Sequence, residues 1–411
     1  MQYLLIKLKN INMYLNRQKI VSVIILCLYV ILLCFVSYYH EPWHDEGQAW
    51  LIARDDSLWH LITVTTHWEG HPPLWHLILM PLAKAGVPFE IGVKFINIMF
   101  STLAMSLLLL KSSMPWYIRF ALPFTYFCFY QYGVVNRTYS LFMFGMMLAA
   151  YYYPLRKEKP YYEAIALMLV SGSMAYGMML ALGIALAWLC DIIKDNGRLN
   201  WKLLDKLCRQ NRECHALLVL LVVSSFWVLT MIPLRETAYT AMRPAPFWQN
   251  LFYSVFVLPS QYFHNFLPQD NMYDFAFTFF ESNIKGYFGM ISQYGIYAYT
   301  IIIQYILSYL YGFFSQIFLL IVASYLGLGM LFILPSCCFY ILASIVFINN
   351  HHIGILFIFN IFIVWQIFSV SPEKSKKFST WFANKFTDMR EYMLIKICLY
   401  LVLFGTLGIN I

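Results

Sequence analysis

Titratable side chains gather in one stretch of this chain, residues 40–74. The stretch reads HEPWHDEGQAWLIARDDSLWHLITVTTHWEGHPPL and holds six carboxylates and five of the 10 histidines, in a 411-residue chain with only 12% charged residues. It directly follows the first long apolar run. Carboxylates and imidazoles are the side chains that most often transfer protons in catalysis. We therefore expect a reaction site here, held in place by the rest of the chain.

Asp45 and Glu46 form the acidic pair nearest the apolar run. A carboxylate just beyond a membrane helix can act as a general base and still reach a substrate carried by a lipid. The alternative is that Asp45 and Glu46 only form an acidic, solvated end of the loop and have no further role. Because sequence neighbours on a helix do not face each other, we expect one carboxylate to be catalytic and the other to be structural or a ligand.

The segment from His40 to His44, HEPWH, matches the H-E-x-x-H motif of zinc metalloproteases. That motif needs both histidines on one face of one helix. Pro42 opposes such a helix, because proline is tolerated only in a helix's first turn. No motif for a third ligand accompanies it. An intramembrane zinc metalloprotease is therefore an alternative that Pro42 argues against.

Three further positions place polar chemistry at the ends of apolar runs. His71 opens HPPLW, which is also a plain helix start with proline at the first position. Arg137 in NRTYS, with Tyr139 beside it, is either an interfacial anchor or a fork that binds a lipid phosphate through two hydrogen bonds. His351 and His352 lie between apolar runs, where histidines are more often interfacial than catalytic.

The composition predicts an all-α, polytopic transmembrane protein. Hydrophobic residues make up 61% of the chain and aromatic residues 19%, and apolar runs of about 17–22 residues recur, as membrane-spanning helices require. A membrane β-barrel would instead show short alternating strands. The net charge of +8 comes from basic residues in short loops, which the positive-inside rule explains, so we expect no nucleic-acid partner. No cysteine lies in the predicted outer loops, so we expect no disulfide framework and no cysteine zinc site.

The order of the runs predicts about 10–12 spans in one membrane domain, residues 1–411. Residues 20–38 form an uncleaved first helix that leaves the cytoplasm. Residues 72–86 are too short to cross and contain Pro81, so they form a re-entrant or interfacial helix. Further spans are expected at residues 91–110, 116–135, 140–153 and 216–233, with two short spans in 161–190 that turn near residues 172–177.

This order divides the chain into three parts. Residues 20–233 form the predicted catalytic module, with a first outer loop at 39–90 that contains juxtamembrane helices. Residues 234–285 form a second outer loop, and residues 286–411 form C-terminal helices. The expected location is the bacterial cytoplasmic membrane, with the reaction site facing outward.

The chain resembles the polytopic glycosyltransferases of the GT-C fold in the order of three segments, WHDEGQAW, HPPLW and NRTYSL. The resemblance is greatest to the protein O-mannosyltransferases, the lipid A aminoarabinose transferases and the lipopolysaccharide-core transferases. Residues 20–190 carry it, and the remainder is similar only in hydropathy. In HHIGILF, His351 stands where the family's Arg-His-x-Gly stretch has arginine.

The resemblance implies transfer of a sugar from a polyprenyl-phosphate donor to a lipid, glycan or protein acceptor. By the family pattern, Asp45 would deprotonate the acceptor hydroxyl, which then attacks and inverts the anomeric carbon. Arg137, helped by His71, would stabilise the departing phosphate. Glu46 would orient the acceptor or bind a cation.

Supporting roles fall to His44, Tyr139 and His352. A divalent cation held by Glu46 with His44 or His71 stays open, since some relatives use a metal and others do not.

Two other membrane classes stay open. A transporter or flippase for lipid-linked sugars should show discontinuous helices in repeated halves, and the sequence shows no such repeat. An O-antigen-type polymerase should carry arginine-rich outer loops rather than an acidic first one. A soluble nucleotide sugar is not expected as donor, because no glycine-rich phosphate loop is present.

Overall fold

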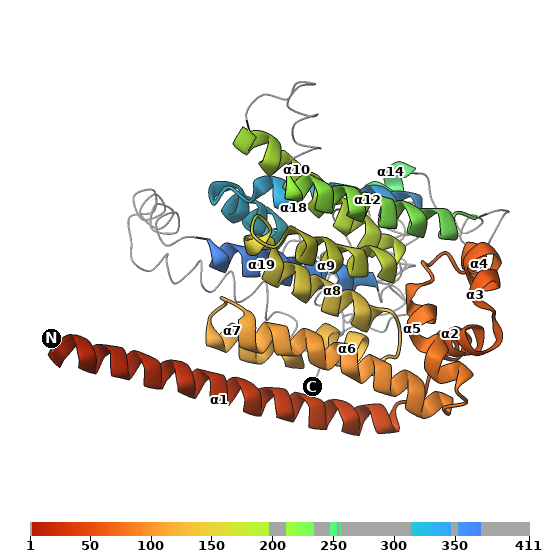
Figure 1. Cartoon of the computed structure of the whole chain (residues 1–411), viewed down its shortest axis with the longest axis horizontal. Coiled ribbons are helices and arrows are strands. Elements are labelled where there is room, and N and C mark those ends of the chain that lie inside the picture. Colours follow the sequence, from red (N-terminus) through yellow and green to blue (C-terminus); the bar gives the residue numbers. More distant parts are fainter. Residues whose placement is uncertain are drawn as a thin grey trace, which may run out of the picture.

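The computed structural model describes residues 2–196, 211–233, 247–252, 255, 314–346 and 352–370. Within these residues all regular structure is helical and no strand occurs. The long helices lie side by side, and the short helices α2 (His44–Asp55), α3 (Leu58–His60), α4 (Thr66–Glu69) and α5 (Leu74–Lys84) cover one end of the bundle (Figure 1). We call this the capped end.

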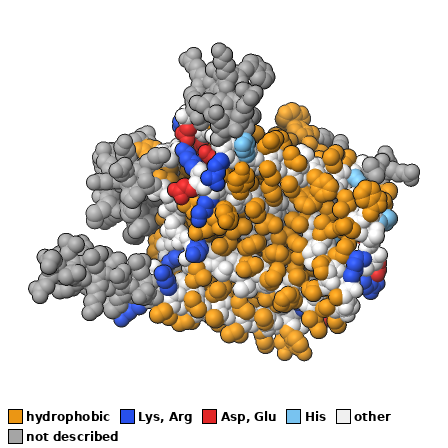
Figure 2. Space-filling model, in the orientation of Figure 1, with side chains coloured by type: hydrophobic (Ala, Val, Ile, Leu, Met, Phe, Trp, Pro, Cys, Tyr) orange, Lys and Arg blue, Asp and Glu red, His pale blue; other side chains and the backbone are white. Residues whose placement is uncertain are grey.

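Four of the described helices are long and apolar enough to cross a membrane. They are α1 (Gln2–Tyr39, apolar from Arg17), α6 (Phe89–Lys111), α10 (Ala175–Asn196) and α12 (Arg212–Met231). Large apolar side chains such as Ile31 on α1 and Leu229 on α12 point away from the protein. Figure 2 shows a broad hydrophobic surface across the bundle. Such a surface fits a helical membrane protein, because lipid rather than water would face it.

Shorter helices fill the middle of the bundle. These are α8 (Tyr139–Tyr152), α9 (Pro160–Ser173), α18 (Gly329–Ile345) and α19 (Ile353–Ser369). Every residue of α19 from Ile353 to Gln366 is buried, as expected for a helix surrounded by others. Helices α10 and α18 approach closely at Gly183, where a Cβ atom would overlap the backbone of Pro335.

The two ends of the bundle differ in charge. Among the described residues, the capped end carries four basic residues, Arg54, Lys84, Lys94 and Arg137, against seven acidic ones, Glu41, Asp45, Glu46, Asp55, Asp56, Glu69 and Glu90. The opposite end, which we call the basic end, gathers Arg17, Lys19, Lys111, Arg119, Arg156, Lys157, Lys159, Lys194 and Arg212. Lys and Arg side chains follow the corresponding edge of Figure 2. There Arg119 bonds Gln18, which ties α7 to α1, and Arg156 bonds Asp191, which ties the turn before α9 to α10.

Several breaks between helices agree with the sequence. Helix α5 has only 11 residues and contains Pro81. Helix α9 ends at Ser173, Met174 is fully extended, and α10 begins at Ala175. The chain therefore breaks where the sequence predicts a turn, but α10 is a long helix rather than a short span.

The segment expected as a span at 116–135 does run from the basic end, where Arg119 bonds Gln18, to the capped end, where Asn136 bonds Glu46, but it is not one continuous helix. Three short pieces replace it: α7 (Trp116–Ala121), the 3-10 turn η2 (Leu122–Phe124) and the π-helix η3 (Phe127–Val134). Pro123 cannot donate a backbone hydrogen bond, and Thr125 is extended with φ −70° and ψ 152°. The second outer loop falls almost entirely outside the described residues, as does much of the C-terminal region.

Candidate functional site

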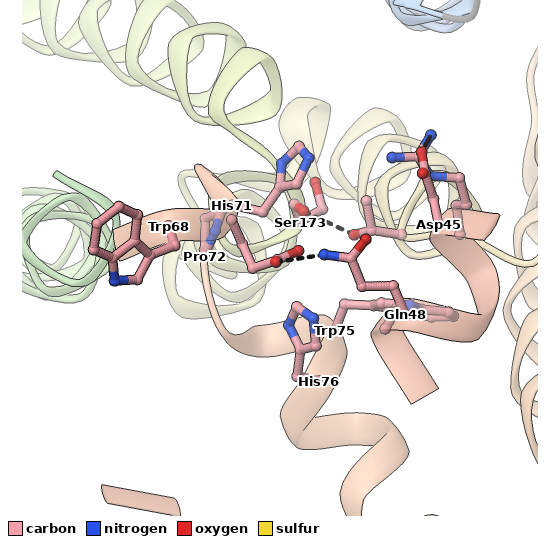
Figure 3. Close-up of a pocket in the computed structure, with 12 residues that line it drawn as sticks. Asp45, Gln48, Trp68, His71, Pro72, Trp75, His76 and Ser173 are labelled. Carbon is pink, nitrogen blue, oxygen red and sulfur yellow. Dashed lines mark hydrogen bonds and ion pairs between the residues drawn. The ribbon is translucent and has the colours of Figure 1, made fainter. Parts of the chain in front are cut away.

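A pocket with a volume of about 360 Å³ lies at the capped end, beside α2, α4 and α5. Its walls carry two carboxylates, Asp45 and Glu69, and two histidines, His71 and His76. Arg137, just before α8, is the one lysine or arginine among the residues that line it. Figure 3 shows Asp45, His71 and His76 around the pocket. A concave site with a few converging polar groups is where ligand binding is first expected.

The start of helix α2 places Asp45 in this pocket. Helix α1 ends at Tyr39, Pro42 lies between the helices, and α2 begins after Trp43, which is extended with φ −73° and ψ 156°. Glu46 accepts a hydrogen bond from the backbone N–H of Trp43 at 3.0 Å, as the glutamate of a capping box does. This bond sets the first turn of α2 and therefore the direction of Asp45.

The two carboxylates point in different directions, as their adjacency predicts. Glu46 has no exposed surface. Nε2 of His40 lies 2.9 Å from its Oε1, and Asn136 donates to its Oε2 from the backbone N–H at 2.9 Å and from Nδ2 at 2.7 Å. Burial alone would raise the pKa of the Glu46 carboxyl, but the bonds from His40, Trp43 and Asn136 lower the pKa below its ordinary value of 4.5.

Glu46 therefore does not line the pocket, contrary to its selection as a catalytic candidate. All of its bonds go to groups of the protein interior, so it ties α2 to the segment before α8.

Asp45 instead meets the pocket's cation. Its Oδ2 lies 2.9 Å from Nη1 of Arg137, and the side chains are 51% and 14% exposed, respectively. The guanidinium also lies over the ring of Tyr139, with Cζ 5.4 Å from the ring centroid, a favourable cation–π contact. The neighbouring Thr138 donates to the Ser173 carbonyl at 2.7 Å, which fixes the segment that carries Arg137.

Tyr139 and His352 lie behind this pair. Tyr139 is buried and stacks on Tyr132, with ring centroids 4.8 Å apart. The ring of His352, just before α19, lies 6.2 Å from that of Tyr139 and 5.0 Å from that of Tyr176. The structure thus brings His352 to the back of the site from the far end of the chain, although it does not line the pocket.

His44 lies outside the site. Its side chain is 90% exposed, with Nδ1 3.8 Å from Asp45 Oδ1. The three residues considered for a divalent cation are therefore separated, with Glu46 in the interior, His44 in solvent and His71 in the pocket. No group of three His, Cys, Asp or Glu side chains suited to a metal ion occurs within the described part of the chain. The residues present do not fit the cation considered above.

The HEPWH segment does not form a protease helix. His40 is almost buried against Glu46, whereas His44 is exposed, and the chain between them is not helical. The physical reason is Pro42, as the sequence indicated.

Glu69 and Gln48 are pocket residues that the motifs did not reveal. Gln48 donates to Glu69 Oε1 at 2.7 Å. Burial raises the pKa of Glu69 and the Asp45 charge raises it further, while Gln48 and Arg137 lower it, so the pKa lies above 4.5 overall. One signal was available for Gln48, because it follows Asp45 by three residues on the same helix face.

Trp75 and His76, both on α5, complete the pocket. Each is only 4% exposed. Burial lowers the pKa of His76 to about 4, although Asp56 acts in the opposite direction, so its ring is neutral near pH 7. Nε1 of Trp75 and both ring nitrogens of His76 have no hydrogen-bond partner among the described residues.

Comparison of the chain with protein-family models, with curated proteins and with solved structures gives no match in any of the three. The arguments for function therefore rest on the chemistry of this pocket and on its place at one end of an apolar bundle.

Proposed function

We propose that this protein is an integral-membrane glycosyltransferase that moves a sugar from a polyprenyl-phosphate donor to a hydroxyl of a lipid, glycan or protein acceptor. One observation carries the proposal: a half-exposed carboxylate, Asp45, and a largely buried guanidinium, Arg137, meet at 2.9 Å in a pocket at the end of an apolar helical bundle.

The position of Arg137 suits a lipid-borne phosphate. A guanidinium presents two parallel N–H donors that match phosphate oxygens. A polyprenyl chain would lie along the apolar surface of the bundle, which brings its phosphate to the level where the helices end. Removing this site from bulk water strengthens the attraction between the guanidinium and the phosphate.

The ion pair also supplies a base when it is needed. As the phosphate takes over Arg137, the Asp45 carboxylate loses its partner and can accept the proton of the acceptor hydroxyl. The hydroxyl oxygen then bonds to the anomeric carbon while the bond from that carbon to the phosphate oxygen breaks. The phosphate leaves with the bonding electrons, and Arg137 stabilises its charge. Attack opposite the leaving group inverts the anomeric centre.

The charge of the two ends supports an orientation. Cytoplasmic loops carry an excess of Lys and Arg, which favours a cytoplasmic basic end and an outward-facing capped end. In a bacterium this would be the periplasmic side of the cytoplasmic membrane. An outward-facing pocket suits a polyprenyl-phosphate donor, because no soluble nucleotide sugar is needed there.

The test measures release of polyprenyl phosphate by the purified protein in nanodiscs, with a panel of undecaprenyl-phosphate sugars and candidate acceptors. Asp45→Asn should lower the release by roughly 10²- to 10⁴-fold, the usual contribution of a general base. Asp55→Asn is the matched control, because Asp55 lies at the other end of α2, is exposed, and pairs with Arg54 outside the pocket.

Three outcomes would be decisive. Equal release by Asp45→Asn and wild type would remove Asp45 from the role of base. In sealed vesicles that contain the same protein, transbilayer movement of the donors without release would favour a transporter. Absence of release by the wild type across the panel would overturn the glycosyltransferase.

A further inference from the structure

One side of the pocket, which we call the pocket floor, consists of Gln48, Glu69, Trp75 and His76. Figure 3 shows Gln48, Trp75 and His76 on one side of the pocket, with His71 and Ser173 on the other. Gln48 and Glu69 bond each other. The indole N–H of Trp75 and the two ring nitrogens of His76 have no such bond within the part of the chain that the structure describes.

Buried polar atoms without partners are uncommon, because they lose their bonds to water and gain none in return. Three such atoms on two consecutive residues, both 96% buried and both lining one pocket, indicate a ligand that supplies the missing bonds. Position distinguishes them from Trp227 on α12, whose indole N–H also has no partner among the described residues but does not line the pocket.

The types of these atoms limit the ligand. The Trp75 indole can only donate, a neutral His76 ring donates from one nitrogen and accepts at the other, and the Glu69 carboxyl accepts beside Gln48. A hydroxyl group both donates and accepts, so neighbouring hydroxyls satisfy all of these atoms. The rings of Trp68 and Trp75 add apolar surface that the C–H faces of a sugar can contact.

We infer that the pocket floor binds the hydroxyl groups of the donor's sugar and that this sugar carries no negative charge. The inference rests on the proposed function, because Arg137 holds the phosphate and the sugar attached to it must lie in the same pocket. A uronic acid would place a third carboxylate beside Asp45 and Glu69, while the one cation among the lining residues is already engaged by the phosphate.

The experiment separates the sugar's contribution to binding from that of the lipid phosphate. Dissociation constants are measured in nanodiscs for undecaprenyl phosphate and for undecaprenyl phosphate carrying glucose, mannose, arabinose or glucuronic acid. The full chain carries Asp45→Asn in every arm, so that bound donor is not consumed. The quantity compared is the ratio of the two dissociation constants, without and with the sugar.

At least one neutral sugar should tighten binding, and glucuronic acid should not. We call the ratio of the two dissociation constants the sugar gain. Trp75→Phe and His76→Leu should each reduce this gain about tenfold, the value of one or two hydrogen bonds. The affinity for undecaprenyl phosphate should stay unchanged. Trp227→Phe, the same substitution outside the pocket, should leave the gain intact. Without ligand, His76→Leu should not melt at a lower temperature than its parent, because it removes two polar atoms that have no partner among the described residues.

Each contrary result has a separate meaning. A sugar gain that is unchanged by both floor substitutions would show that these atoms are only hydrated. It would overturn the proposed sugar-binding role of the pocket floor and leave the proposed glycosyltransferase activity standing. A preference for glucuronic acid would overturn the uncharged sugar. Failure of the protein to bind or turn over any polyprenyl-phosphate lipid would overturn the proposed function together with the floor.

Discussion

Asp45 and Glu69 share one pocket but differ in what surrounds them. Asp45 is half exposed and has a guanidinium 2.9 Å away. Glu69 is more enclosed, and its nearest partner is the neutral amide of Gln48. Burial and the nearby Asp45 charge raise the pKa of Glu69 above its ordinary value of 4.5. Glu69 therefore keeps its proton to a higher pH than a free glutamate does.

The proton on Glu69 gives a pH-dependent stability that can be measured. Burial, together with the Asp45 charge, raises the pKa of Glu69 above 4.5, so the folded protein binds this proton more tightly than the unfolded chain. The resulting stabilisation is complete below pH 4.5 and is lost as the pH rises through the folded-state pKa. The melting temperature of wild type relative to Glu69→Gln, measured in detergent, should therefore fall across this range.

Glu90→Gln is the control for this measurement, because Glu90 is exposed at the start of α6 and pairs with Lys94. The melting temperature of wild type relative to Glu90→Gln should not fall above pH 4.5. A constant difference between wild type and Glu69→Gln at every pH would contradict the raised pKa.

At the scale of elements, two adjacent contacts join α2 to the segment before α8. Asp45 pairs with Arg137, and the next residue, Glu46, accepts two hydrogen bonds from Asn136. Neighbouring residues on each segment thus bond neighbouring residues on the other. The buried Glu46–Asn136 contact fixes the separation of the two segments. That separation in turn determines how closely Asp45 and Arg137 approach each other in the pocket.

Glu46→Gln tests this dependence. A glutamine amide would turn N–H groups toward the N–H donors of Asn136 or His40, so at least one buried bond is lost. We expect a loss of about 1.5–3 kcal/mol in the free energy of unfolding, the range for bonds to a charged group. A lower kcat for donor release with little change in KM is also expected, because the Asp45–Arg137 geometry shifts.

Glu46→Asp keeps the charge and should recover part of both losses. Glu90→Gln, at an exposed position, should change the unfolding free energy by less than about 0.5 kcal/mol. Equal stability and equal kcat in Glu46→Gln and wild type would show that the interior contact does not position the pair.

Sequence reasoning predicted elements better where a local cause was present. Pro42 predicts the break between α1 and α2, and a glycine-containing segment predicts the break after α9. The interruption of residues 116–135 was missed, although Pro123 stands in its middle, because hydropathy alone was read there. The Gln48–Glu69 bond and the approach of His352 to Tyr139 join residues far apart in the chain. Their pairing depends on how the helices pack, which one sequence does not reveal.

At the scale of the whole molecule, the charge difference between the ends can be tested directly. In a chain whose native cysteines are replaced by alanine, Asp55→Cys marks the capped end and Asp195→Cys the basic end. Both positions are exposed to solvent in the structure. On intact bacteria, a membrane-impermeant maleimide should label Asp55→Cys, whereas Asp195→Cys should react only after the membrane is permeabilised.

Labelling of both variants in detergent is the control for the reactivity of the two thiols. The opposite pattern on intact cells would reverse the orientation and move the pocket to the cytoplasm.

The burial of α19 on all sides has a consequence for how the protein is made. Its neighbours α8, α10 and η3 leave the ribosome long before it does. They form the walls of a space that stays open to lipid, or to an insertion factor, until α19 arrives. His352, at the start of α19, reaches the back of the site at that same moment. Completion of the bundle core and placement of His352 behind the pocket are therefore one event, and a chain truncated before α19 would present an unfilled core to membrane quality control.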